Sequence, residues 1–405
     1  MPVPPKHRAP VKICSRLSSP AQRPVLPKLG AGLPARYRQL PGAVAQHGGA
    51  TSAFRALWAG LPGLAWEASA RWRANGVGMT PVPGEVDLLV VGAGPTGLFA
   101  AYYAGFRGMS VAVVDALPEP GGQVTAMYPE KMIYDVAGFP EVRGRDLVDA
   151  LVRQAAQYDP VYLLGRHAEK LSEVEGGLLV DVGERESVRA GAVLVTAGIG
   201  EFTPRPLPAA DDWLGRGVVH FIPELGAHSG QDVVVVGGGD SAFDWALALH
   251  PVARSVTLVH RRARFRAHAG LVDKVRGLGV PLITDAEVAE IRGDDAGPHE
   301  VELALAGDRR QVLPAQAVVA ALGFTADLGP IESWGLELEK RTIRVDSTMR
   351  TSRERVYAAG DVAAYPGKVK LIATGFGEAA TAVNNIAVAL NPEAHLFPGH
   401  SSNMG

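Results

Sequence analysis

The sequence predicts an α/β protein in which one strand–helix–strand domain is inserted into another of the same kind. Two glycine-rich motifs support this prediction: V-V-G-A-G-P-T-G at residues 90–97 and V-V-G-G-G-D-S-A at residues 235–242. Each follows a short apolar run that is typical of a buried parallel strand, and each precedes a helical stretch. One such motif is a weak signal, but two in the same context favour two Rossmann-like dinucleotide-binding domains over chance glycine turns.

The residues of these motifs suit the binding of a pyrophosphate. Glycines let the backbone turn tightly and approach the phosphates, whose charge then rests on the N-terminus of the following helix. We therefore predict cofactor contacts within both motifs, at Gly92, Gly94, Thr96 and Gly97 in the first and at Gly237, Gly239, Asp240 and Ser241 in the second.

The two motifs differ in the charge that follows the second strand. Asp115 is separated from Gly92 by the same spacing that separates His260 from Gly237, and His260 is followed by Arg261 and Arg262. An acidic residue at this position accepts hydrogen bonds from ribose hydroxyls, whereas basic residues accommodate a 2′-phosphate. The sequence therefore predicts FAD at the first motif and NADPH at the second.

The order of the predicted elements supports the inserted arrangement. The apolar runs V-L-V-T-A-G-I-G at 193–200 and A-V-V-A-A-L-G-F at 317–324 each end in a glycine turn, and we interpret them as a double linker. We expect strands at 86–91 and 110–114, a strand-rich stretch at 161–195, hairpin strands at about 286–306, and helices at about 96–107, 144–157 and 373–389. The predicted segments are an N-terminal extension (1–84), the FAD-binding domain (85–200 and 325–405) and the NADPH-binding domain (201–324).

The composition excludes several classes of protein. Of the 405 residues, 47% are apolar and 20% are charged, as in ordinary globular chains. No apolar stretch approaches the roughly 18 residues that a membrane-spanning helix needs. The one cysteine, Cys14, argues against a disulfide framework or a cysteine metal cluster, so no metal site is predicted. This cysteine content is compatible with a reducing cytoplasm.

Charge is distributed unevenly along the chain. Residues 1–78 contain eleven Lys or Arg, ten Pro and one acidic residue, whereas residues 79–405 contain 29 basic and 41 acidic residues. A basic, acid-poor start is compatible with a disordered tail, a targeting segment such as a transit peptide, or a functional module such as a nucleic-acid arm. We favour an over-extended gene start that precedes Met79, and we predict no nucleic-acid partner.

The run R-V-Y-A-A-G-D-V at residues 355–362 offers another site residue. Asp361 follows a short predicted strand and precedes a helix. An Asp there is often only a helix cap, but together with the upstream motifs we favour contact with the ribityl–phosphate part of FAD.

Residues 86–405 resemble the thioredoxin-reductase-like ferredoxin–NADP reductases throughout. The motifs that carry the resemblance are G-A-G-P-T-G, G-G-Q-V-T-A-M-Y-P-E-K, I-Y-D-V-A-G-F-P, G-G-G-D-S-A-F-D-W-A, H-R-R-A-R-F-R-A-H, A-A-G-D, G-F-G-E-A-A-T-A-V-N-N and G-H-S-S-N. The resemblance implies FAD contacts at Asp115, Gln123, Tyr128, Ala168, Phe202, Asp361 and Ser402. It also implies a catalytic role for Tyr128, lying on the flavin ring, and for His400, in a tail that covers the other ring face from the partner subunit of a homodimer.

The sequence departs from the thioredoxin reductases in one respect. Those enzymes place C-x-x-C just before the second glycine motif, whereas residues 218–230 here contain no cysteine. A dithiol relay needs two thiolates, so we expect this chain not to pass electrons to a disulfide in that way. The resemblance implies that the acceptor is ferredoxin or flavodoxin. The open alternatives are a flavin reductase or diaphorase with another acceptor and a non-catalytic redox sensor. Candidate docking cations for an acidic carrier are Arg143, Arg145, Lys368 and Lys370.

Overall fold

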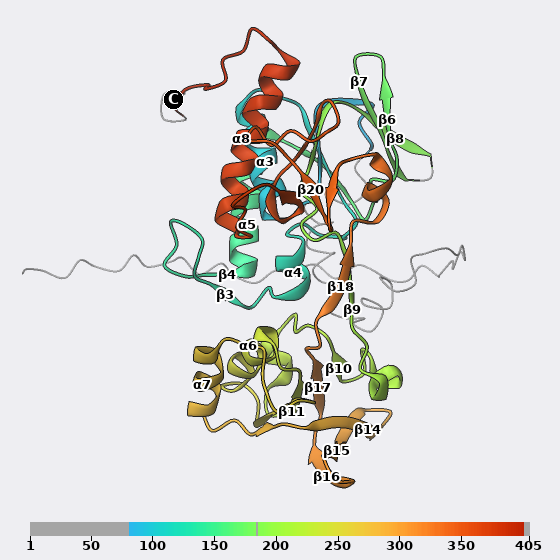
Figure 1. Cartoon of the computed structure of the whole chain (residues 1–405), viewed down its shortest axis with the longest axis vertical. Coiled ribbons are helices and arrows are strands. Elements are labelled where there is room, and N and C mark those ends of the chain that lie inside the picture. The colour runs from blue at the N-terminus through green and yellow to red at the C-terminus, as the bar shows by residue number, and fades with distance from the viewer. Residues whose placement is uncertain (1–80, 184, 401–405) are drawn as a thin grey trace, which may run out of the picture. The chain divides into compact units, whose positions relative to one another are not determined.

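The computed structural model describes residues 81–183 and 185–400 (Figure 1). Most of the predicted N-terminal extension, including Cys14, and the predicted FAD contact Ser402 lie outside the described residues.

The first sheet is a mixed sheet built around β1. The strand order is β5-β2-β1-β8-β7-β6, and β21 pairs with β8 beyond the end of β7. The neighbours of β1 are parallel to it, and its apolar residues Leu88, Leu89 and Val90 are fully buried, which explains the continuous apolar run in the sequence. The strands are β1 (Glu85–Val91), β2 (Val111–Asp115), β5 (Val161–Leu164), β6 (Leu171–Val174), β7 (Gly177–Gly183), β8 (Glu186–Val195) and β21 (Val356–Ala358).

The register of this sheet brings four distant segments to one edge. Val91 pairs with both Val114 and Val195, and Val195 pairs with Ala358. The residues that follow these strands therefore emerge together at the carboxyl edge of the sheet, which is where open α/β sheets bind ligands.

Three long helices cover the first sheet. α3 (Pro95–Phe106) begins directly after the glycine turn with proline in its first turn, where the missing N–H costs nothing. It packs against α5 (Gly144–Ala155) and α8 (Ile372–Leu390), and Figure 1 shows α3 beside α8. The shorter elements of this part are α4 (Gln123–Met127), β3 (Met132–Ile133), β4 (Val142–Arg143), β19 (Leu338–Glu339), β20 (Thr342–Arg344) and β22 (Ala363–Ala364).

The second sheet repeats the pattern of the first. Its five parallel strands have the order β10-β17-β11-β12-β13, and Val236 at the end of β11 pairs with Val259 and Ala320. The elements are β10 (Val218–Val219), β17 (Ala317–Ala320), β11 (Asp232–Val236), β12 (Ser255–Val259), β13 (Leu282–Ile283), α6 (Asp240–Leu249) and α7 (Ala269–Gly277).

The chain enters and leaves the second sheet through one pair of strands. β9 (Glu201–Pro204) pairs antiparallel with β18 (Phe324–Asp327), and β21 then returns to the first sheet. The predicted fold class, with one Rossmann-like domain inserted into another, is confirmed. The predicted hairpin is also present in a three-stranded sheet, β14 (Ala286–Asp294), β15 (Gly297–Leu305) and β16 (Arg309–Pro314).

Short 3₁₀ helices complete the described chain: η1 (Ala156–Tyr158), η2 (Pro208–Trp213), η3 (Leu225–His228), η4 (Gly329–Trp334) and η5 (Gly360–Val362). Two helices, α4 and α7, were not predicted from the sequence. α4 has only five residues after the Gly121–Gly122 turn, which is too short for a helical period to be visible. Within residues 81–183 and 185–400, the structure contains no helix long and apolar enough to cross a membrane.

Candidate functional site

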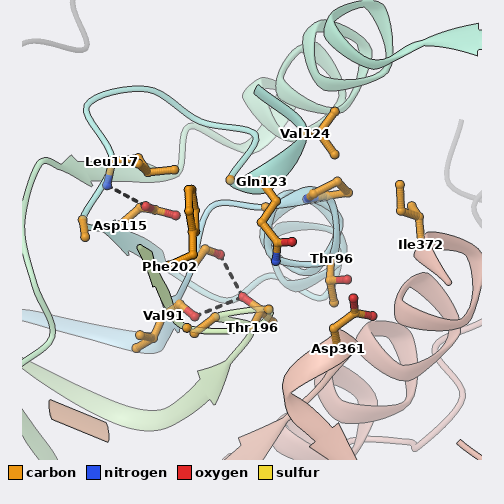
Figure 2. A pocket seen from close by; sticks show the side chains of 18 of the residues that line it. Val91, Thr96, Asp115, Leu117, Gln123, Val124, Thr196, Phe202, Asp361 and Ile372 are labelled. Atoms are coloured by element: carbon orange, nitrogen blue, oxygen red, sulfur yellow. Dashed lines mark hydrogen bonds between the residues drawn. The ribbon is translucent and has the colours of Figure 1, made fainter. Parts of the chain in front are cut away.

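A cavity of about 660 Å³ opens at the carboxyl edge of the first sheet. Most of the predicted FAD contacts line it, although they come from six separate parts of the chain. Figure 2 shows Asp115 and Asp361 at opposite ends of this cavity, with Gln123 and Thr96 between them. The predicted residues that line it are Gly92, Gly94, Thr96, Asp115, Gln123, Tyr128, Ala168, Phe202 and Asp361.

The glycines of the first motif have different structural roles. Gly92 has φ +113°, and a Cβ there would lie 2.6 Å from the carbonyl oxygen of Thr196. A Cβ at Gly97 would lie 1.9 Å from the carbonyl oxygen of Gly92, so this glycine allows α3 to pack against the turn and does not itself line the cavity. Gly94 has open space beside it, which leaves the N-terminus of α3 accessible to an anionic ligand.

Asp115 is held rigidly at one end of the cavity. Its carboxylate accepts hydrogen bonds from the N–H groups of Ala93 (2.6 Å) and Leu117 (2.8 Å), and the latter is drawn in Figure 2. Burial raises the pKa of Asp115, while these two N–H groups and the nearby His167 lower it. His167 itself lies 3.2 Å from Glu201, and both line the cavity. The sequence reasoning missed these two residues because neither belongs to a local motif.

The other end of the cavity combines an aromatic ring with a carboxylate. Burial raises the pKa of Tyr128 to about 12, and the nearby Asp361 and Asp135 contribute to this rise. Burial also raises the pKa of Asp361, whereas Lys370 and Lys368 lower it. At neutral pH, the Tyr128 hydroxyl is therefore a hydrogen-bond donor.

The cavity residues fit FAD. The glycine turn with the open N-terminus of α3 suits a pyrophosphate, and the separated carboxylates of Asp115 and Asp361 suit the hydroxyls of a ribose and a ribityl chain. Phe202 is 4% exposed and lines the same cavity, which gives the ligand an apolar wall.

The second glycine motif lies at the carboxyl edge of the second sheet. A Cβ at Gly237 would lie 2.4 Å from the carbonyl oxygen of Ala321, so the turn requires glycine there. Gly239 has open space at the N-terminus of α6, and Ser241 is exposed in its first turn. Asp240 accepts a hydrogen bond from the N–H of His268 (2.8 Å), which fixes the following segment against this helix.

The sequence predicted His260 as part of a basic surface, but the structure places its side chain in a buried position. It is 9% exposed, and a Cβ at Gly238 would lie 2.3 Å from its ring, so the imidazole packs against the glycine turn. Burial lowers the pKa of His260, and Arg261 and Arg262 add to this effect. The ring is therefore neutral at pH 7, and its buried Nε2 has no hydrogen-bond partner among the described residues.

The positive charge at this edge comes from arginines. Arg261 and Arg262 are exposed and form no ion pair with any carboxylate of the described chain. Two further exposed arginines, Arg264 and Arg266, lie in the same segment, and the backbone N–H of Arg266 donates to the carbonyl oxygen of Gly238 (2.7 Å). This hydrogen bond brings Arg266 to the glycine turn, a placement that the spacing from Gly237 did not predict.

The described part of the C-terminal tail does not reach the cavity of its own chain. His400 is exposed, and its ring lies 5.2 Å from that of Phe397 in an edge-to-face arrangement. Arg107 at the end of α3 donates to the carbonyl oxygens of His395 (2.8 Å) and Leu396 (3.4 Å), which attaches the tail to the first domain.

The candidate docking cations are mostly paired. Arg143 and Arg145 both form ion pairs with Glu130, and Lys368 is 8% exposed and paired with Glu378. Lys370 is the candidate that is exposed at the cavity. No group of three or more His, Cys, Asp or Glu in the described ranges is placed to hold a metal ion.

Comparisons with known proteins agree with this geometry. The family described as pyridine nucleotide-disulphide oxidoreductase matches residues 86–385. A ferredoxin–NADP reductase of Salinispora arenicola is 62% identical over 318 residues, covering 78% of this chain and 98% of the relative. One from a Nocardioides species is 63% identical over 322 residues, covering 78% and 97%. The crystal structure of T. acidophilum thioredoxin reductase is 25% identical with a TM-score of 0.64, covering 75% of this chain and 98% of that one.

Proposed function

This chain belongs to the pyridine nucleotide-disulphide oxidoreductase family, and from this premise we propose that it is a ferredoxin–NADP reductase. It uses FAD to transfer electrons between NADPH and ferredoxin. The observation that carries the proposal is a glycine turn at the carboxyl edge of each of the two sheets. An acidic residue, Asp115, follows the second strand of the first unit, and two arginines, Arg261 and Arg262, follow the second strand of the other. The similar proteins from Salinispora arenicola and Nocardioides, both ferredoxin–NADP reductases, support the choice of ferredoxin.

The first site holds FAD in this proposal. The turn at Gly92 and the N-terminus of α3 bind the pyrophosphate, Asp115 binds the ribose and Asp361 binds the ribityl chain. Gln123, Ala168 and Phe202 line the cavity along the ligand, and Tyr128 stacks on the flavin ring. When bound, the flavin supplies the redox chemistry, accepting a hydride from NADPH and releasing electrons singly.

The second site holds NADPH. Gly237, Gly239 and the N-terminus of α6, with Asp240 and Ser241, bind its pyrophosphate. Arg261 and Arg262 bind the 2′-phosphate, since guanidinium groups match phosphate geometry and keep their charge at any working pH. The neutral ring of His260 packs against Gly238 and so helps to hold the glycine turn in place.

The residues before the second motif exclude one acceptor. Residues 218–230 contain no cysteine, so the chain offers no thiol pair there to reduce a disulfide. We infer that the acceptor is a one-electron carrier, ferredoxin or flavodoxin, and that Lys370 is one of its docking cations. We also infer a homodimer in which His400 and Ser402 of one subunit cover the flavin of the other, and a location in the reducing cytoplasm.

Reduction of purified ferredoxin by NADPH, followed as ferredoxin-dependent reduction of cytochrome c, tests the proposed acceptor. We expect turnover that depends on ferredoxin, with thioredoxin plus a disulfide substrate as the negative control. Rapid reduction of a dye such as ferricyanide without any reduction of ferredoxin or flavodoxin would instead indicate a diaphorase. Bound FAD without NADPH oxidation by any acceptor would indicate a redox sensor.

A further inference from the structure

A buried ion pair lies beside the turn that carries Asp361. Glu378 on α8 and Lys368 are 5% and 8% exposed, and the Lys368 ammonium donates to a carboxylate oxygen of Glu378. Neither residue lines the cavity. Removing two charges from water is costly, and their attraction offsets this cost only when further hydrogen bonds satisfy the remaining atoms.

Two further donors satisfy the Glu378 carboxylate. The backbone N–H of Gly360 donates to Oε2 (2.7 Å), and the hydroxyl of Tyr365 donates to Oε1 (2.5 Å). Burial and the hydrogen bond to Glu378 raise the pKa of Tyr365 to about 12, so its hydroxyl remains a donor at neutral pH. One carboxylate therefore ties both ends of segment 360–368 to α8.

The tied segment has little room to move at its first residue. Gly360 has φ +81°, and a Cβ there would lie 2.9 Å from Oγ1 of Thr96. A Cβ at Gly375, in the first turn of α8, would lie 2.3 Å from the same oxygen. The turn and the N-termini of α3 and α8 therefore meet around Thr96, and a shift of Gly360 would carry Asp361 with it.

The charges of the pair also act on Asp361. Burial raises the pKa of the Asp361 carboxyl group, Lys370 and Lys368 lower it, and the charge of Glu378 adds to the rise. Lys368 is therefore close enough to attract Asp361, and the charge of Glu378 offsets that attraction.

We propose that Glu378 is a positioning residue for the flavin site: paired with Lys368, it holds the Gly360 turn so that Asp361 presents its carboxylate to the cavity. The inference rests on the proposed binding of FAD. Without Glu378, the ammonium of Lys368 would lie buried and unpaired, and it would draw the Asp361 carboxylate away from the ligand.

Titration of the apoprotein with FAD, followed by quenching of flavin fluorescence, tests this role. Glu378→Gln keeps one oxygen as an acceptor for the Gly360 N–H, removes the charge, and replaces the oxygen that accepts from Tyr365 and Lys368 with an amide nitrogen that cannot accept. We expect it to weaken FAD binding about tenfold or more, the effect of losing one charge-assisted interaction. Glu354→Gln, which changes an exposed carboxylate in the turn before β21, is the matched control and should bind FAD as the wild type does.

Two further variants separate positioning from a purely structural role. Lys368→Met should also weaken FAD binding, whereas the double variant Glu378→Gln/Lys368→Met leaves no buried unpaired charge and should bind FAD more tightly than either single variant. In an Asp361→Asn background, Glu378→Gln should change the FAD dissociation constant less than about threefold, because its effect passes through Asp361.

Three results would overturn the proposal. One is an FAD dissociation constant unchanged by Glu378→Gln while the unfolding temperature of the apoprotein falls. Another is an equal loss of affinity with and without Asp361, and the third is a double variant that binds no better than the single variants. The assay needs no acceptor protein, so intact FAD binding without ferredoxin reduction would refute the acceptor and leave this test valid. A wild-type apoprotein that binds no FAD would overturn both proposals.

Discussion

Replacing Arg261 and Arg262 with alanine should abolish the preference for NADPH. Both side chains are exposed and make no ion pair with a described carboxylate, so their loss should cost little folding stability. A charge-assisted contact to phosphate contributes roughly 1.5–3 kcal/mol. Because these arginines are exposed to solvent, we take the lower value for each, which gives about 3 kcal/mol for the pair, or about 100-fold in kcat/KM.

Steady-state kcat/KM with NADPH and with NADH, using ferricyanide as the acceptor, measures this effect without any dependence on ferredoxin. NADH lacks the 2′-phosphate, so its kcat/KM should change less than about threefold. Arg309→Ala, which removes another exposed arginine in β16, is the matched control and should leave both cofactors unaffected. An equal fall with both cofactors would mean that the arginines support the structure of the site. An unchanged NADPH value would assign the phosphate to Arg264 and Arg266.

Two further predictions concern the flavin site. Asp115→Asn should weaken FAD binding by about 1–2 kcal/mol, since the amide loses the charge that strengthens hydrogen bonds to ribose hydroxyls. Burial raises the pKa of Asp115, and only the ionised carboxylate is a full acceptor for the ribose hydroxyls. The FAD affinity of the wild type should therefore fall as the pH drops through that raised pKa, and the Asn variant should lack this fall. FAD titrations of the apoprotein across pH measure this, and identical profiles for the two proteins would place Asp115 outside the site. Deleting residues 398–405 should alter the flavin absorbance and slow electron transfer while leaving NADPH binding intact, and mixing this variant with Asp361→Asn chains should partly restore activity if the tail acts across a dimer. A monomer by light scattering, or a spectrum and turnover indifferent to the deletion, would remove His400 and Ser402 from the site.

The sequence prediction of the first candidate site rests mostly on local determinants. In a β–α–β unit the first and second strands are neighbours, so a fixed spacing from Gly92 reaches Asp115 at the same sheet edge. The same spacing located Arg261 and Arg262, since Val236 and Val259 are paired in register. The assignments of Tyr128, Ala168 and Phe202 needed a family resemblance, because no spacing rule connects these residues to the glycine motif.

The sequence by itself determined the two glycine turns and the charge at the end of each second strand. Successive strands of a β–α–β unit pair side by side, so the residues after them reach the same sheet edge. Only the tertiary structure decided what depends on contacts between distant segments. β21 pairs with β8, and this brings Asp361 to the edge already occupied by Asp115. The ring of His260 lies beneath Gly238 as a neutral group, although its position in the sequence indicated a cation. Lys368, predicted at the surface, is buried against Glu378, because the direction and burial of a side chain depend on which elements pack around it.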